Sequence, residues 1–456
     1  MSTLRRALFG ACALLAVSTT PAFADAASTP GRVDSGDTAW LLLCAALVFI
    51  MTPGLGFFYA GMIRSKNALS VLMQSFVACG LITLQWVAIG YSIAFGPDVH
   101  HLFGNLSWAF FKNVSASAPS PLYAPTVPHQ AFAIYQLMFA IITPALISGA
   151  VVERMKFQAY VVFILLWATF VYDPLAHWVW ADGGWLARMG VHDFAGGTVV
   201  EIASGVSALV MALLLGPRSK NPFGDDMRPH NLPFTLLGGC LLWFGWLAFN
   251  SGSAGSAGGS AVGAFVATQI AMSAAAVTWM AADWIMYKKP TTLGFISGAV
   301  AGGVAITPSC GYMGISGALA VGIGAGVICY LAIRIKNKIA ADDSLDVFGV
   351  HGCGGMWGVL ANGFFGTLGG TAAAVVLSPN PRIHQILVQA LAMLAAIAFT
   401  AIGTVVVAMV TKAACRGLRT TGEDEEVGLD EADHGEAAYS PGEGAHMVGS
   451  GMAVVE

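Results

Sequence analysis

The chain has 456 residues, of which 56% are hydrophobic and 10% are charged, and its net charge is −4 at pH 7. This composition is typical of a protein that crosses a membrane many times, and it excludes an ordinary soluble enzyme. The length leaves room for about ten to twelve membrane-spanning helices joined by short loops.

Residues 1–24 have the pattern of a secretory signal peptide. Arg5 and Arg6 precede an apolar segment of about ten residues, and Ala22 and Ala24 form a small-residue cleavage site. The apolar segment is too short to cross a bilayer. We therefore expect cleavage after Ala24, which places the new N-terminus outside the cytoplasm.

The rest of the chain contains eleven apolar runs that predict membrane-spanning helices. An odd number of spans places the two ends of the mature chain on opposite faces. The predicted inner loops and tail carry fifteen Lys and Arg residues and the predicted outer loops carry four, which favours an outer N-terminus and an inner C-terminus. The runs are 39–61, 68–95, 129–152, 157–172, 194–216, 232–250, 260–282, 292–308, 312–333, 347–369 and 386–411.

Beyond the last run the chain changes character. Residues 423–456 contain ten acidic side chains and no Lys or Arg. Such a segment is either disordered or a regulatory docking segment. The predicted organisation is thus a signal peptide at 1–24, an eleven-helix domain at 25–411 and a cytoplasmic tail at 412–456.

Two ionisable side chains lie deep inside predicted spans, Glu201 in DFAGGTVVEIASG and His351 in DVFGVHGCGGMWG. Glu201 is about 12 Å along the helix from Asp193, close to the middle of a bilayer core. The two spans run in opposite directions, so the side chains are expected to meet. A neutral pair would line a pore for an uncharged solute, an ionised pair would relay protons, and a purely structural pair would lock two helices together.

The two spans also open alike. Asp193 and a glycine pair precede Glu201, and Asp346 with Gly349 precedes His351. Five spans in each half would enter the membrane from opposite faces. The sequence therefore predicts an inverted five-plus-five repeat with a site at its interface.

Aromatic and hydroxyl side chains gather at the expected outer ends of the spans. Trp180 ends the fourth span, Phe139 and Phe249 lie in or near the mouths of theirs, and the run SGSAGSAGGS at 251–260 offers Ser hydroxyls. A Trp face binds a small cation with up to about 2 kcal/mol when the site is dry. The eight cysteines contain no C-x-x-C pair, so no metal site is expected.

Several blocks make the chain resemble the ammonium transporter family (Amt/Mep/Rh). The resemblance runs from about residue 37 to Tyr439 and includes the tail motif GLDEADHGEAAY. The blocks are FFYAGMIRSKN (57–67), DFAGGTVVEIASG (193–205), PHNLPFTLLGG (229–239), GWLAFNSGSAG (245–255), TPSCGYMG (307–314) and DVFGVHGCGGMWG (346–358).

The resemblance implies an all-α homotrimer with one pore in each eleven-helix subunit, located in a bacterial inner membrane. It implies that Trp180, Ser253 and Phe139 recruit ammonium, that Phe139 and Phe249 form a phenyl gate, and that Asp193 supports the site. Glu201 and His351 match the pore pair, of which most members have two histidines. No cofactor, catalytic residue or nucleic-acid partner is implied, whereas a nitrogen-regulatory PII protein is implied at the inner face.

We interpret the sequence as an ammonium transporter that deprotonates the ion and passes ammonia and a proton separately. One alternative is a sensor with little flux, and another is a neutral channel of the Rh type for ammonia or carbon dioxide. A third is an intramembrane enzyme that uses Glu201 and His351 as acid and base, although Cys353 is a poor nucleophile beside them.

Overall fold

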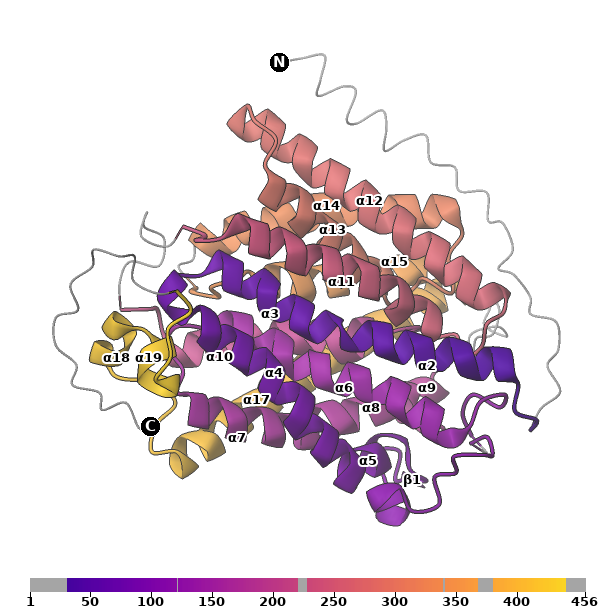
Figure 1. Ribbon diagram of the computed structural model, residues 1–456. Coiled ribbons are helices and arrows are strands. Elements are labelled where there is room, and N and C mark those ends of the chain that lie inside the picture. The colour runs from indigo at the N-terminus through magenta and orange to yellow at the C-terminus, as the bar shows by residue number, and fades with distance from the viewer. Residues whose placement is uncertain (1–30, 121, 220–227, 339–340, 368–379, 440–456) are drawn as a thin grey trace.

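The computed structural model describes residues 31–120, 122–219, 228–338, 341–367 and 380–439. Figure 1 shows long helices packed side by side in one bundle. A short antiparallel hairpin, β1 (Asp98–Val99) and β2 (Phe103–Gly104), follows α5. In chain order the helical elements are α2 (Ser35–Phe49), α3 (Met51–Met62), η1 (Ser65–Asn67), α4 (Ala68–Gln85), η2 (Trp86–Gly90), α5 (Tyr91–Phe95), η3 (Leu106–Phe111), α6 (His129–Val151), α7 (Phe157–Trp167), η4 (Ala168–Tyr172), α8 (Asp173–Trp180), α9 (Trp185–Arg188), η5 (Gly197–Ile202), α10 (Ala203–Leu215), α11 (Leu232–Gly252), α12 (Gly259–Tyr287), α13 (Thr292–Ile306), α14 (Ile315–Lys338), η7 (Phe348–Gly352), α15 (Cys353–Phe365), α17 (Pro381–Ala414), α18 (Gly422–Val427) and α19 (Leu429–His434).

The long helices are apolar enough to cross a membrane. In the described ranges, nine helical stretches have the length and composition of membrane spans. The predicted runs at 292–308 and 347–369 correspond to the shorter α13 and to η7 with α15. Helices are expected in every apolar run because a bilayer offers the backbone no other hydrogen-bond partners.

The fourth predicted run, 157–172, was too short. The helix continues through η4 and α8, so Asp173 and His177 lie inside one long buried stretch. Partners on other elements make this possible: Gln85 donates to Asp173 at 2.7 Å, and Asp98 contacts His177 at 2.9 Å. The expectation of only two ionisable groups deep in the spans is therefore wrong.

Close glycine contacts bring the two central spans together. The backbone of Gly352 in η7 lies against Gly205 in α10, where an added Cβ would overlap its nitrogen. On the facing pair, a Cβ on Gly355 in α15 would lie 2.8 Å from the Cβ of Glu201 in η5. Small residues at both crossings let η5 and η7 approach in the middle of the bundle.

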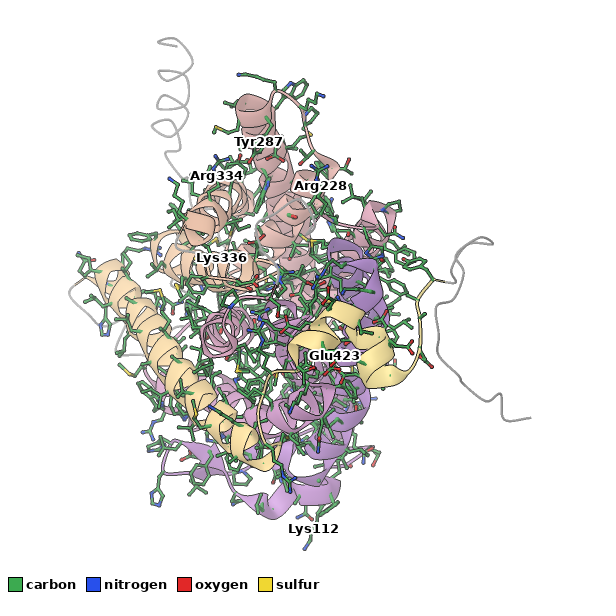
Figure 2. All side chains as sticks on the ribbon, turned by 90° about the vertical axis from the view of Figure 1, so that its left-hand side faces the viewer. Lys112, Arg228, Tyr287, Arg334, Lys336 and Glu423 are labelled. Carbon is green, nitrogen blue, oxygen red and sulfur yellow. The ribbon has the colours of Figure 1, made fainter. Side chains whose placement is uncertain are left out.

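The described part of the tail packs against one end of the bundle. The carboxylate of Asp430 accepts hydrogen bonds from the backbone N–H groups of Leu69 (3.1 Å) and Ser70 (2.8 Å). Leu429 N donates to the side chain of Asn67 at 2.8 Å. Figure 2 looks onto this end and shows the short yellow helices α18 and α19 lying over it. Of the two interpretations of the tail, docking therefore applies to the described part.

Two of the predicted segments cannot be compared with the structure in full. The signal peptide at 1–24 lies outside the described residues, as do the last tail residues, 440–456.

Candidate functional site

A cavity of about 340 Å³ opens at the end of the bundle that carries the 251–260 glycine-serine run. Its lining includes Trp180, Phe139 and Ser253. The rings of Phe139 and Trp180 meet edge to face, with centroids 5.9 Å apart and planes at 86°. The indole of Trp180 is fixed by a 2.8 Å hydrogen bond from its Nε1 to the backbone oxygen of Asp193. The cavity thus presents aromatic faces beside a hydroxyl, the surroundings that suit a small cation with N–H donors.

The hydroxyl of Ser253 is oriented by its neighbours. Its Oγ donates to the backbone oxygen of Phe249 at 2.9 Å and lies 3.2 Å from the hydroxyl of Tyr135. Tyr135 in turn donates to the same Phe249 oxygen at 2.7 Å. Because the Ser253 proton is already used, the lone pairs of the oxygen are what remains for a ligand. Tyr135 was not predicted as a site residue, because a single tyrosine in an apolar run carries no motif that marks it as functional.

The floor of the cavity lined by Trp180 is closed by two phenyl rings. Phe139 on α6 and Phe249 on α11 have ring centroids 4.1 Å apart and planes inclined at 32°. Each side chain is 1% exposed. Rings in such contact leave no gap between them, so passage at this point requires a ring to move.

Beyond the rings, Glu201 and His351 are in direct contact. Glu201 Oε2 lies 2.7 Å from His351 Nδ1, and the two side chains are 1% and 6% exposed. Both belong to π-helical turns, η5 and η7, which occur often at functional sites. They share an apolar pocket with Phe249. The proximity expected from the opposite span directions is thus present, and a carboxyl and an imidazole at this distance can share one proton.

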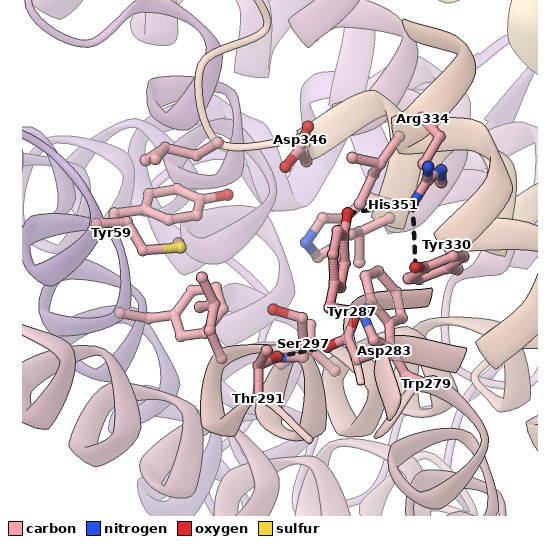
Figure 3. A pocket seen from close by; sticks show the side chains of 18 residues that line it. Tyr59, Trp279, Asp283, Tyr287, Thr291, Ser297, Tyr330, Arg334, Asp346 and His351 are labelled. Carbon is pink, nitrogen blue, oxygen red and sulfur yellow. Dashed lines mark hydrogen bonds between the residues drawn. The ribbon is translucent and has the colours of Figure 1, made fainter. Parts of the chain in front are cut away.

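A second cavity, of about 260 Å³, begins on the other side of His351. Figure 3 shows the imidazole among the lining side chains, which include Tyr59, Tyr287 and Asp346. Arg334 lies at the rim over two tyrosine rings. Since Nδ1 is engaged by Glu201, Nε2 is the ring nitrogen that remains for a solute or water. His351 therefore lies at the boundary between the apolar pocket and the second cavity.

Asp193 caps the turn that carries Glu201. Its Oδ1 accepts from the backbone N–H groups of Gly196 (2.8 Å) and Gly197 (2.6 Å). Its Oδ2 accepts from the N–H of Thr198 at 2.8 Å and from the hydroxyl of the same residue. A carboxylate at the first turn satisfies N–H groups that have no partner within the helix. Asp193 thus holds η5 rather than facing the cavity lined by Trp180 with free oxygens.

The counterpart of Asp193 in the second half is Asp343, and the assignment of Asp346 to that place is wrong. Asp343 accepts from Val347 N at 3.1 Å and Phe348 N at 2.8 Å, and it precedes His351 by eight residues, as Asp193 precedes Glu201. Asp346 instead forms a 2.5 Å ion pair with Lys336. Asp343 was not identified as this counterpart because three acids, Asp342, Asp343 and Asp346, stand in one short polar segment.

A buried ion-pair network lies at the end of the bundle near the tail. Arg218 contacts Glu153 at 2.6 Å and Asp342 at 2.9 Å, and Arg64 contacts Glu153 at 2.9 Å. Burial alone would raise the pKa of Glu153, but Arg218 and Arg64 outweigh it and hold that pKa below its usual range. The network was not visible in the sequence because its members are 65 or more residues apart. Within the described ranges, no cluster of His, Cys, Asp or Glu could hold a metal ion.

Comparisons with known proteins agree on one family. The sequence model of the Ammonium Transporter Family matches residues 39–439. The ammonium transporter of Mycobacterium tuberculosis is 47% identical over 437 residues, covering 90% of this chain and 91% of that protein. The crystal structure of Saccharomyces cerevisiae Mep2 has a TM-score of 0.78 and 36% identity, covering 86% of this chain and 89% of that one. A structure titled "Sensor Amt Protein" has a TM-score of 0.79 and 27% identity, covering 88% and 98%.

Proposed function

The chain belongs to the ammonium transporter family, and from this premise we propose that its Glu201–His351 pair relays the proton of ammonium through the pore. The protein is a multi-pass membrane transporter and not an enzyme, which excludes the interpretation as an acid–base enzyme. The observation that carries the proposal is the 2.7 Å contact between a carboxyl and an imidazole in an apolar pocket beneath the phenyl rings.

In the proposed first step, ammonium enters the cavity lined by Trp180, which we assign to the outer side and call the outer cavity. The Ser253 oxygen accepts a hydrogen bond from the ion, and the ring faces of Trp180 and Phe139 attract its charge. The support for this role is that all three side chains line one cavity and that the Ser253 proton points elsewhere. Phe139 and Phe249 then act as a gate that opens by ring rotation.

In the proposed second step, the ion gives up a proton near the gate. An intact cation in an apolar pocket is costly, whereas neutral ammonia is not. The proton passes to Glu201 and then through the shared hydrogen bond to His351. Ammonia meanwhile moves to the second cavity beyond His351, which we call the inner cavity. Asp193 and Asp343 hold the two pore residues in place through the turns that they cap. The result is one charge transferred for each ammonia.

We further propose that eleven spans form an inverted five-plus-five repeat, with an outer N-terminus and an inner C-terminus, in a homotrimer of the bacterial inner membrane. The signal peptide at 1–24, the transport domain at 25–411 and the tail at 412–456 remain part of this proposal. The docked α18 and α19 support an inner-face regulatory tail, where a PII protein would bind. Matching turns around Asp193 and Asp343 support the repeat.

The test is an electrical recording on proteoliposomes at varied ammonium concentration and pH. We expect a saturable current from the wild type and none from Glu201→Ala, although the variant protein still assembles. Asp283→Asn, which removes a carboxyl from α12 in the wall of the inner cavity, is the matched control and should keep the current. An unchanged current in Glu201→Ala would refute the relay.

A sensor with little flux is the second candidate, favoured by the similarity to the structure titled "Sensor Amt Protein". A sensor would bind ammonium with a saturable change in the tail, measured by protease protection of α18 and α19, and would give no steady current. The same recording therefore separates the two candidates, and it also separates a neutral channel, which would carry ammonia without current.

A further inference from the structure

A cluster of two histidines and one acid lies outside the pore, beside the helix that carries Trp180. His177 on α8 is fully buried and lies between two acceptors, the backbone oxygen of Ala94 (3.0 Å from Nδ1) and Asp98 Oδ1 (2.9 Å from Nε2). His101 stands on the other oxygen of the same acid, with Nδ1 3.0 Å from Asp98 Oδ2. The mechanism proposed above uses none of these three side chains.

Both ring nitrogens of His177 face acceptors. The backbone carbonyl of Ala94 on α5 only accepts a hydrogen bond, and so does the carboxylate of Asp98 on β1. Burial raises the pKa of Asp98, but the hydrogen bonds from His177 and from the His101 backbone outweigh it and hold that pKa below its usual range. His177 therefore ties α8 to both α5 and β1.

His101 links the Asp98–His177 ion pair to the loop after α8. Its Nδ1 lies 2.7 Å from the backbone oxygen of Gly183, and its Nε2 lies 3.0 Å from the guanidinium of Arg188.

The ion pair fixes the end of α8. The backbone oxygen of His177 accepts from Ala181 N at 3.2 Å and so closes the last helical turn, which contains Trp180. The following loop passes so close to the acid that a Cβ on Gly183 would lie 2.7 Å from the Asp98 Cβ. Trp180 is the last residue of α8, and its side chain has little rotational freedom because the indole is hydrogen-bonded to Asp193. The position of the indole at the outer cavity therefore depends on how α8 is held.

We propose that His177, held between Asp98 and the backbone oxygen of Ala94, positions Trp180 for ammonium recruitment. A side chain that can donate to only one of these two acceptors leaves the last turn of α8 with one tether fewer. The inference rests on the proposed recruitment role of Trp180. His177 and Asp98 are positioning residues, because neither lines the outer cavity.

The test measures the half-saturating ammonium concentration and the maximal current in proteoliposomes. We expect His177→Gln to raise the half-saturating concentration about three- to tenfold, as loss of one positioning hydrogen bond produces, with a maximal current within about twofold of the wild type. Asp98→Asn should behave likewise, and the double variant should add nothing further. His384→Gln, a histidine at the start of α17, is the control and should keep the wild-type half-saturating concentration.

A wild-type half-saturating concentration in His177→Gln would overturn the proposal, whether the maximal current is unchanged or lowered. If His177→Gln does not reach the membrane, Asp98→Asn decides, and a wild-type half-saturating concentration in that variant overturns the proposal. Trp180→Ala distinguishes failure of the recruitment role from failure of the positioning role. If it leaves half-saturation unchanged, the recruitment role fails; if it raises half-saturation while His177→Gln does not, the positioning inference alone fails.

Discussion

A single methyl group added at Gly355 should uncouple the two pore residues. The Cβ of Gly355→Ala would lie 2.8 Å from Glu201 Cβ, 3.1 Å from the backbone oxygen of Gly197 and 3.1 Å from Ile202 Cγ1. Carbon atoms in good contact are about 3.5–4.0 Å apart, so α15 and η5 must separate by about 1 Å. Overpacking of this kind costs about 1–3 kcal/mol, partly offset by the better helix propensity of alanine.

The separation acts directly on the hydrogen bond. The Glu201–His351 contact is 2.7 Å, and a shift of about 1 Å carries it beyond hydrogen-bond range. We therefore expect Gly355→Ala to lose most of the ammonium current in proteoliposomes while the protein remains inserted. Gly80→Ala is the matched control, because a Cβ at that exposed site on α4 meets nothing within 4 Å. A wild-type current in Gly355→Ala, with the protein correctly inserted, would refute the role given to the contact.

Two further predictions concern the cap of η7 and the ion-pair network near the tail. Asp343→Asn should lower the current by displacing η7, because an amide cannot accept on both sides, whereas Asp346→Asn should have little effect; equal losses in the two variants would contradict the assigned symmetry. Arg218→Ala should destabilise the protein by about 3–5 kcal/mol near pH 7, since Glu153 and Asp342 each lose one charged partner in a buried site. The pKa values of both acids lie below their usual range, Asp342 because the hydrogen bond and charge of Arg218 outweigh its burial. Their contribution to stability is therefore full above the unfolded pKa values, near pH 4, and is lost as the pH falls. Thermal unfolding in detergent should show a loss of stability at acid pH in the wild type and a smaller loss in Arg218→Ala. An equal loss in the two proteins would contradict the stabilising role of the network.

The helical architecture could be predicted because each apolar run holds helical structure. Where the prediction of a helix end was wrong, a polar residue was the cause: Asp173 and His177 looked like the end of a span and are instead buried with partners on other elements. Gln85 and Asp98 precede Asp173 by more than seventy residues. Sequence reasoning has no means of pairing such distant side chains.

The contact between Glu201 and His351 could be predicted because each stands alone in an apolar run, so that a partner was needed. Which acid caps the second turn could not, since Asp342, Asp343 and Asp346 differ only in where the backbone points them. Asp342 joins the ion network and Asp343 caps η7. The π-helical turns that present both pore residues have no sequence signature and could not be predicted.

The central claim is that one proton charge crosses with each ammonia by way of Glu201. The most direct measurement is the ratio of charge to ammonia moved, recorded as current and as isotopic ammonia uptake in the same proteoliposomes, for the wild type and for Glu201→Gln. The glutamine keeps the volume of the side chain and a hydrogen bond to His351 but holds no exchangeable acid proton. We expect a ratio near one in the wild type and loss of the current in Glu201→Gln, whereas an unchanged ratio and current in that variant would contradict the central claim.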